Sequence, residues 1–100
     1  MAHASGELPV HLNNHHLNTL SVIFAHPVSH NIRWHDALSL MEAVGEVEER
    51  HDGRFKVTIG AETEVLDRPR DKDLGTEMVV DLRRMLANAG FDPKPKGEEI

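Results

Sequence analysis

The sequence predicts an α+β fold in which a three-stranded antiparallel sheet carries helices packed on one face, in the order α-α-β-β-β-α. Three observations support this fold. Apolar residues recur at helical spacing in two segments before residue 46 and in one after residue 75. Between these segments, apolar and polar residues alternate, and glycine-containing turns divide the stretch into short strands. A run of strands between helices is typical of an antiparallel sheet whose helices lie on one side.

The first helix is predicted over residues 14–25, and Asn13 or Asn14 can cap its N-terminus. Pro27 ends the helix, because the residue before a proline is disfavoured in the helical region. The apolar face of this helix is predicted to consist of Leu17, Leu20, Ile23 and Phe24.

The second helix is predicted over residues 33–44, and Gly45 suits its C-terminus. Its apolar stripe consists of Trp34, Ala37, Leu38, Met41 and Val44. Trp34 and Phe24 could each stack on a nucleobase. Their positions on apolar helical stripes favour packing in the core instead.

Three strands are predicted next, over residues 46–50, 54–59 and 63–68. The three-residue turns 51–53 and 60–62 each contain glycine, which suits hairpin loops of that length. The outward side chains predicted for this sheet are Glu46, Glu48, Arg50, Arg54, Lys56, Glu64 and Arg68. Such a mixed-charge face suits water or a polar protein partner.

The loop lengths also predict the register of the two hairpins. In the first hairpin, Glu48 is expected opposite Lys56. In the second, Val57 is expected opposite Val65 on the inner face, with Glu64 diagonal to Lys56. Lys56 would then lie between two carboxylates.

The last helix is predicted over residues 76–89, with Asp73 or Thr76 as its N-cap and Gly90 at its end. Its apolar residues keep three- and four-residue spacing throughout: Met78, Val79, Leu82, Met85, Leu86 and Ala89.

The length of 100 residues suits one domain, which we expect over residues 13–91 between flexible tails at residues 1–12 and 92–100. The absence of cysteine excludes disulfide scaffolds, thiolate zinc sites and cysteine nucleophiles. No apolar run approaches the roughly 18 residues that span a bilayer, and the N-terminus lacks the features of a signal peptide. We therefore expect a cytoplasmic protein with no cofactor and no membrane partner.

Two segments carry a resemblance to a known family. One is Asn31-Ile32-Arg33-Trp34-His35-Asp36; the other begins at Arg68-Pro69 and continues in the last helix as Asp81-Leu82-Arg83-Arg84-Met85-Leu86-Ala87-Asn88-Ala89-Gly90. With the three-strand meander between them, they resemble HicA-type proteins, small bacterial toxins of toxin–antitoxin systems. Over residues 31–91, the resemblance implies a fold like the double-stranded RNA-binding domain and, as the family activity, cleavage of messenger RNA.

The sequence departs from the HicA pattern at the catalytic position. The resemblance implies a histidine where the second strand begins, but this chain has Arg54 there, and His51 lies three residues earlier. His51 could act as a general acid or base in RNA cleavage. Alternatively, His51-Asp52-Gly53 is only a hairpin turn, because Asp and Gly tolerate the dihedral angles that such turns require.

The candidate surface for binding RNA or a partner consists of cations in the second strand, after the third strand and in the last helix: Arg54, Arg68, Arg70, Lys72, Arg83 and Arg84. Proteins of the resembling fold contact phosphates from helices and loops rather than through the sheet. Acidic residues are interleaved with these cations, so a solvated, salt-bridged surface is the other interpretation. The formal net charge of −6 disfavours RNA as the ligand.

Eight histidines are present, and seven of them lie at or before residue 35. His11/His15 and His26/His30 have the i, i+4 spacing that can chelate a metal on a helix. Pro27 interrupts the second pair, however, and neither pair has the intervening acidic residue of a zinc-protease motif. We therefore predict no metal site and interpret these histidines as solvated, with a pH-sensitive surface as the alternative.

Two functions remain open. The first is a small non-catalytic HicA-like interaction domain, whose partner is another protein or a second copy of the chain. The apolar face of the leading helix could cover the domain or pair with that second copy. The alternative is an RNA-binding protein or an mRNA-cleaving toxin of a toxin–antitoxin system. The sequence leaves open whether the chain is an enzyme, because His51 is the only candidate for a catalytic role.

Overall fold

The fold is given by a computed structural model that describes residues 11–28, 31–70 and 72–92. The elements follow in the order α1 (Asn14–Ile23), α2 (Trp34–Val44), β1 (Glu46–Glu49), β2 (Arg54–Ile59), β3 (Glu62–Asp67) and α3 (Thr76–Asn88). This order, with an antiparallel sheet β1-β2-β3, confirms the predicted α+β fold. Most of the two predicted tails lies outside the described residues, but Leu12, expected in the N-terminal tail, is buried in the core.

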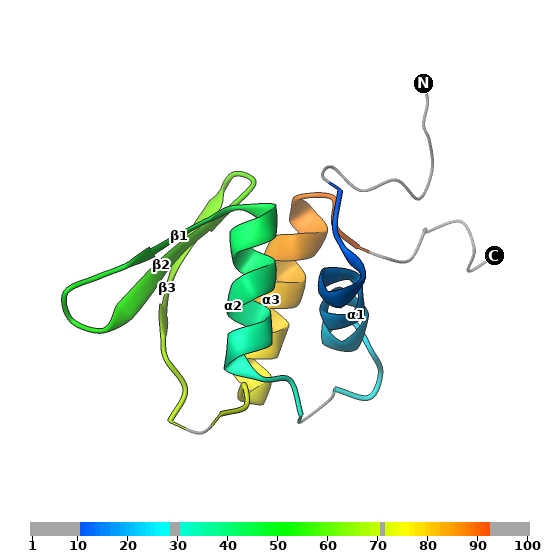
Figure 1. The fold of residues 1–100 in the computed structure, drawn as a ribbon, viewed down its shortest axis with the longest axis horizontal. Helices are drawn as coiled ribbons and strands as arrows, with labels where there is room; N and C mark the ends of the chain where they lie inside the picture. The colour runs from blue at the N-terminus through cyan, green and yellow to red at the C-terminus, as the bar shows by residue number, and fades with distance from the viewer. Residues whose placement is uncertain (1–10, 29–30, 71, 93–100) are drawn as a thin grey trace.

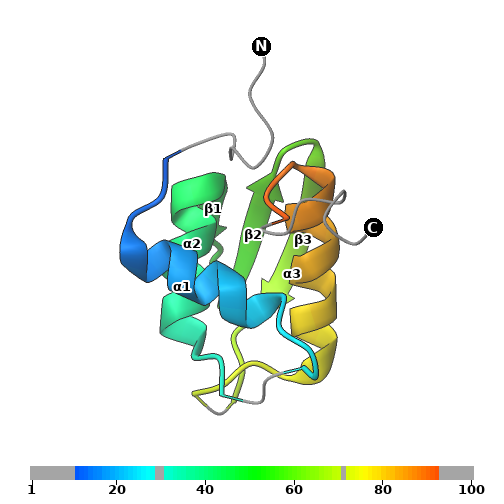
Figure 2. The ribbon, with the colours of Figure 1, turned by 90° about the vertical axis from the view of Figure 1, so that its right-hand side faces the viewer.

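The helices lie on one side of the sheet in two layers. Figure 1 shows α2 and α3 side by side between the sheet and α1. Figure 2 shows α1 crossing both of these helices on the side away from the sheet. The leading helix therefore covers the outer surface of α2 and α3, and the opposite face of the sheet remains open.

One hydrophobic core connects the layers. Its largest fully buried side chains come from three helices and the central strand: Leu20, Ile23, Leu40, Met41, Val57, Ile59, Val79, Leu82, Met85 and Leu86. Fully burying an aliphatic side chain of this size stabilises the fold by roughly 1.5–3 kcal/mol. Because Leu20 and Ile23 of α1 are among these buried side chains, this helix is an integral part of the domain.

The ends of α1 and α2 follow the predicted signals with small shifts. The side chain of Asn13 accepts a hydrogen bond of 2.8 Å from the backbone N–H of His16, so Asn13 caps α1. α1 ends at Ile23, two residues before its predicted end. α2 begins at Trp34, one residue after its predicted start, and is followed by Gly45 as predicted.

α1 buries a face rotated from the predicted one. Leu20 and Ile23 are fully buried, as expected, but Leu17 is 40% exposed. Thr19 is buried in its place, because its hydroxyl donates a hydrogen bond to the backbone carbonyl oxygen of His15 and so satisfies its polar group within the helix.

The caps of α3 differ from the prediction at one end only. Gly75 is the N-cap and provides no side-chain hydrogen bond, so neither Asp73 nor Thr76 caps the helix. At the other end, Gly90 adopts φ 91°, and the backbone N–H groups of Gly90 and Phe91 donate back to carbonyl oxygens of the last turn. The predicted stop at Gly90 is therefore correct.

The first hairpin has the predicted register and the second does not. Glu48 lies opposite Lys56, as expected from the first turn. The second loop has two residues, Gly60 and Ala61, rather than three. Gly60 adopts φ 60°, which a tight two-residue hairpin requires at its first position and which glycine reaches without steric cost.

This shift of one residue exchanges the two faces of β3, because side chains alternate along a strand. Val57 lies opposite Glu64, so Glu64 faces the helices instead of the outer surface. Val65 lies opposite Lys56 on the outer face and is 46% exposed, whereas it was expected in the core. Arg68 follows the end of β3 and lines a pocket with Trp34 of α2, so it does not lie on the outer face as predicted.

Candidate functional site

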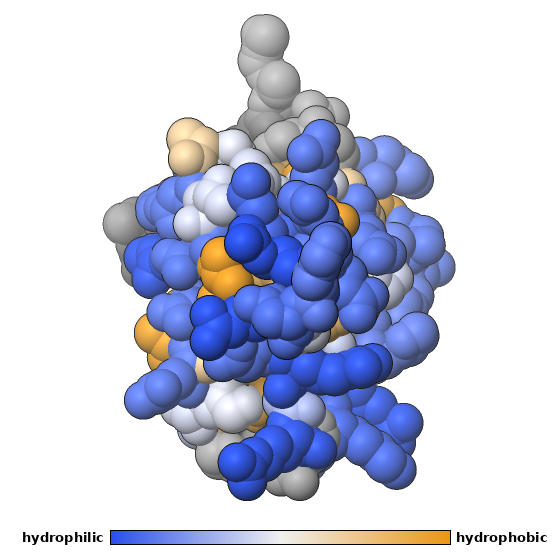
Figure 3. Space-filling view, turned by 90° about the vertical axis from the view of Figure 1, so that its left-hand side faces the viewer, coloured by the Kyte–Doolittle hydropathy of each residue, from blue (hydrophilic) through white to orange (hydrophobic). Residues whose placement is uncertain are grey.

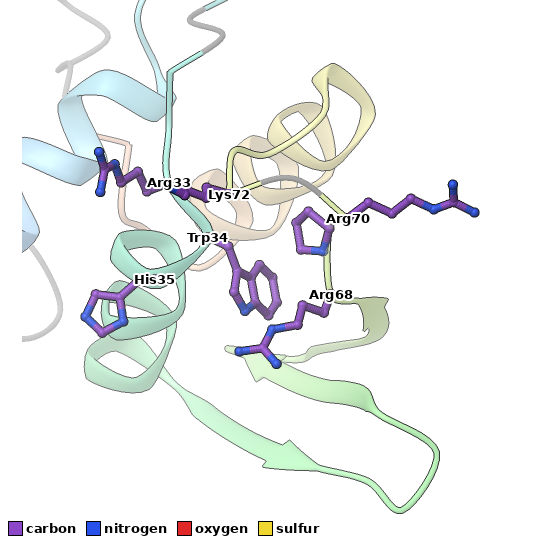
Figure 4. A pocket seen from close by; sticks show the side chains of 7 residues that line it. Arg33, Trp34, His35, Arg68, Arg70 and Lys72 are labelled. Carbon is purple, nitrogen blue, oxygen red and sulfur yellow. The ribbon is translucent and has the colours of Figure 1, made fainter.

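A pocket of about 350 Å³ lies between the start of α2 and the segment that follows β3 (Figure 4). It is lined by Arg33, Trp34, His35, Arg68, Pro69, Arg70 and Lys72. Four of these side chains carry a positive charge and none is acidic. A cationic pocket beside the N-terminus of a helix suits an anionic group, because the helix dipole adds to the positive potential.

The pocket is built by two segments that lie side by side although they are distant in the sequence. The backbone N–H of Trp34 donates to the carbonyl oxygen of Lys72 (2.7 Å), and the N–H of Leu74 donates to the carbonyl oxygen of Ile32 (2.8 Å). These bonds hold the chain after β3 against the entry to α2. The cations of both segments therefore lie around the first turn of α2.

Trp34 forms the buried wall of this pocket. Its side chain is only 6% exposed and packs edge-on against Phe55 of β2, with ring centroids 5.2 Å apart and an interplanar angle of 65°. Phe24 is half-buried against the same core. The core interpretation of both aromatic residues is thus correct, and stacking a base on Trp34 would require the core to open.

The indole Nε1–H of Trp34 is buried and has no hydrogen-bond partner among the described residues. A buried donor without an acceptor costs about 1–3 kcal/mol, and nearly all buried polar groups in proteins are paired. Phe at this position would provide aromatic packing without that penalty. The N–H of Trp34 therefore calls for an explanation other than packing.

Arg83, a predicted binding residue, is committed to the fold. Its Nε donates to the backbone carbonyl oxygen of Ile23 (2.7 Å), and its Nη2 donates to the carbonyl oxygen of Ala25. Both acceptors lie at the C-terminal end of α1, which has no other cation in its last turn. Arg83 holds α1 on the domain and is not available to a phosphate.

Arg84 is also engaged within the chain. Its guanidinium contacts Glu62 (3.4 Å), Glu64 (2.9 Å) and Asp81 (3.3 Å). Partial desolvation lowers the pKa of Arg84, but the hydrogen bond to Glu62 and the charges of all three carboxylates outweigh it and raise the pKa above its ordinary value. This ion-pair network joins α3 to the helix side of β3.

Arg54 pairs with Asp67 on the outer face of the sheet, at 3.1 Å from Nε to Oδ1. By contrast, Arg68, Arg70 and Lys72 form no ion pair or side-chain hydrogen bond with another residue in the part of the chain that the structure describes. The structure thus divides the six predicted cations into three that are paired within the chain and three that line one pocket.

Arg33 also lines this pocket, although it was not among the binding residues predicted from the sequence. Its position beside Lys72 depends on the pairing of residues 32–34 with residues 72–74, a contact between distant segments. The available signal was its place directly before the first turn of α2, where a ligand can meet the helix N-terminus.

His51 lies in a different depression, lined by Glu48, Glu49, Arg50, His51, Asp52 and Lys56. This depression shares no lining residue with the pocket beside Trp34. The side chain of Asp52 accepts a hydrogen bond from the backbone N–H of Arg54 (3.1 Å), and Gly53 adopts φ 86°. These features are those of a hairpin turn, the second interpretation of His51-Asp52-Gly53.

The histidines of α1 contact α2. Nε2 of His15 lies 3.3 Å from a carboxylate oxygen of Asp36, and Nε2 of His16 lies 3.0 Å from the hydroxyl oxygen of Ser39. Within the described residues no group of three or more His, Asp or Glu side chains could hold a metal ion. His30, half of one predicted chelating pair, lies outside those residues.

The outer face of the sheet is hydrophilic almost throughout (Figure 3). The strand residues that the register places on it are Glu46, Glu48, Arg54, Lys56, Thr58, Thr63, Val65 and Asp67. Cations and carboxylates are mixed on this face, and Arg54 already pairs with Asp67. It therefore offers a ligand no concentrated charge, in contrast to the pocket beside Trp34.

Comparisons of the chain with protein-family models, with curated proteins and with solved structures give no match. None of the helices in the described ranges is both long enough and apolar enough to cross a membrane.

Proposed function

We propose that this chain is a small non-catalytic interaction domain, similar to HicA-type proteins, that binds an anionic segment of a protein partner in the pocket beside Trp34. One observation carries the proposal. Arg68, Arg70 and Lys72 are free of ion pairs with the described residues and line one pocket with Arg33, and none of the lining residues that the structure describes is acidic. A binding site needs charges that are not already satisfied within the molecule.

The surroundings of His51 support a non-catalytic function. A general acid or base for RNA cleavage must approach the reacting oxygen within hydrogen-bond reach. At His51 the phosphate would have to approach Glu48, Glu49 and Asp52, whose negative charges oppose it. Two cations, Arg50 and Lys56, also line this depression, but the three carboxylates outnumber them, and Arg68, Arg70 and Lys72 lie at the other pocket.

The position of α1 supports a separate partner rather than a dimer formed through this helix. Leu20 and Ile23, the apolar residues available for such a dimer, are fully buried against the same chain. The exposed Leu17 alone is too small a surface for a stable interface, which buries about 800 Å² on each side.

Catalysis is tested by incubating a structured RNA hairpin with the wild-type chain and with His51→Ala, and then measuring the length of the RNA. We expect no cleavage by either protein. Cleavage that the His51→Ala change abolishes would overturn the non-catalytic proposal and favour the mRNA-cleaving alternative.

Binding is tested by titration with a glutamate-rich peptide at low salt. The double variant Arg68→Ala/Arg70→Ala is compared with Arg50→Ala/Arg54→Ala, which removes the same charge from exposed residues at the other hairpin. We expect the pocket variant to bind at least tenfold more weakly and the control to bind nearly as well as the wild type. Equal losses would show that only net charge matters, and the proposed site would be wrong.

RNA binding is the second candidate, because the same four cations could contact phosphates. It predicts that an RNA hairpin binds more tightly than the peptide and that its affinity falls steeply with salt, since phosphate contacts release counterions. The net charge of −6 opposes both anionic ligands, so the comparison of their affinities decides between the two candidates.

A further inference from the structure

The unpaired indole of Trp34 and the guanidinium of Arg68 line the same pocket as two hydrogen-bond donors without an acceptor. In Figure 4 the side chain of Arg68 points toward the indole of Trp34. Arg70 and Arg33 extend away from the indole on opposite sides. Arg68 is therefore the cation placed to act together with the indole N–H.

The missing partner of these two groups is an acceptor with negative charge. Trp offers only a donor at Nε1, and the guanidinium offers only donors. The described lining of the pocket contains no carboxylate. The N-terminus of α2, which has no side-chain cap, opens into the same pocket and favours an anion there.

We propose that Trp34 Nε1–H and Arg68 together bind one carboxylate of a Glu or Asp side chain from an acidic segment of a partner protein. One carboxylate oxygen accepts the hydrogen bond of the indole, and the other accepts from the guanidinium. The inference rests on the proposed function. It adds that the recognised group is a carboxylate and that Trp34 and Arg68 bind it. Because Arg68 is exposed, its side chain can change rotamer when the carboxylate approaches the buried indole nitrogen.

A single carboxylate fits the charge distribution better than a phosphate backbone does. A nucleic acid brings many phosphates and binds through an extended positive surface. Here four cations surround the pocket beside Trp34, while the cations Arg50 and Lys56 on the neighbouring sheet lie among the carboxylates of Glu46, Glu48 and Glu49. A carboxylate also has two oxygens in one plane, which match two donors side by side.

The chain contains a single tryptophan, so the indole N–H gives one resonance in a ¹H–¹⁵N correlation spectrum and reports directly on the site. During titration of the full chain with an end-blocked glutamate-rich peptide, we expect this resonance to move downfield and to saturate with binding. A glutamine-rich peptide of the same length should leave it in place. An indole resonance that stays fixed while the glutamate peptide saturates would overturn the proposal.

Trp34→Phe removes the donor and keeps an aromatic ring against Phe55. We expect this variant to bind the glutamate peptide about tenfold more weakly, the factor that corresponds to about 1.4 kcal/mol. Arg68→Ala should weaken binding at least as much, and Arg70→Ala should weaken it less. A thermal melt checks that each variant folds. If Trp34→Phe does not fold, the peptide affinity of Arg68→Ala and the indole resonance of the wild type still test the proposal.

The outcomes separate this inference from the function on which it rests. If Trp34→Phe binds like the wild type while Arg68→Ala/Arg70→Ala binds weakly, the indole has no role, but the interaction domain stands. If neither change weakens binding, both proposals are wrong. The shift of the indole resonance could also saturate at a lower concentration of an RNA hairpin than of the peptide. That result would show that the site prefers a phosphate to a carboxylate and would overturn the proposal.

Discussion

Arg83 of α3 donates a hydrogen bond from Nε to the backbone carbonyl oxygen of Ile23, 60 positions earlier in the chain, at 2.7 Å. Its second contact, to the carbonyl oxygen of Ala25, lies just beyond the same end of α1. The carbonyl groups at a helix C-terminus lack partners within the helix, and a cation there satisfies them and opposes the helix dipole. Arg83 thus attaches α1, the outer helix, to α3 in the inner layer.

Replacing Arg83 by Met keeps much of the aliphatic stem and removes both donors. We expect the free energy of unfolding, measured by urea denaturation, to fall by about 1–3 kcal/mol, because a charge-assisted hydrogen bond is lost and carbonyl groups are left unpaired. Amide protection against hydrogen exchange should fall most in α1. Arg84→Met on the same helix is the control and should cost less, because its guanidinium is exposed to water; equal losses would contradict the assigned role of Arg83.

The register of the second hairpin is tested with two valines. Val65 is 46% exposed on the outer face, so Val65→Thr should change the free energy of unfolding by less than about 0.5 kcal/mol. Val57 is fully buried, so Val57→Thr should cost about 1–3 kcal/mol for burying a hydroxyl. Similar losses at both positions would instead favour a register that places both valines on the inner face.

Gly45 connects α2 to β1 and passes close to the backbone of β2. A Cβ atom at this position would overlap with the carbonyl oxygen of Thr58, and a backbone atom cannot turn away as a side chain can. We expect Gly45→Ala to destabilise the fold by about 1–3 kcal/mol in thermal or urea unfolding. Gly75→Ala, where a Cβ meets nothing within 4 Å, should cost less than about 1 kcal/mol. An equally small loss at Gly45 would show that the strand pair adjusts.

Gly75 caps α3 without a side-chain hydrogen bond, although its φ of −77° and ψ of 163° suit any residue. Gly75→Ser provides an oxygen that can accept from the free N–H groups of the first turn. We expect a gain of roughly a few tenths of a kcal/mol in the free energy of unfolding. Gly53→Ser, at φ 86°, should be destabilising because only glycine adopts that conformation readily. A loss of stability in Gly75→Ser would contradict the assigned cap.

Short-range sequence patterns were sufficient to predict most of the helices and strands. The bounds of β2 follow directly from the alternation of its residues, and Asn13 and Gly90 mark helix ends through contacts within one turn of the chain. Such features depend on the backbone and on residues that are close in the sequence, so they can be predicted without knowledge of the tertiary structure. For the same reason, the first hairpin and its pair of Glu48 and Lys56 could be predicted.

The second hairpin could not be predicted from its own residues. A loop of two residues and a loop of three both use Gly60, so the turn alone does not select the register. The observed register turns Glu64 toward α3, where it meets Arg84 at 2.9 Å. That ion pair joins residues 20 positions apart, and its effect on register appears only after α3 has packed on the sheet.

By itself, the sequence determined the order of the elements, the core interpretation of Trp34 and the cations from which a binding site could be built. It could not separate Arg68, Arg70 and Lys72 from the cations that the fold uses, and it did not place Arg33 among them. Tertiary structure alone decided this, because a cation is free or engaged according to whether an acceptor lies beside it in space. For Arg83 that acceptor is a carbonyl of α1, whereas for the buried N–H of Trp34 the described chain provides none.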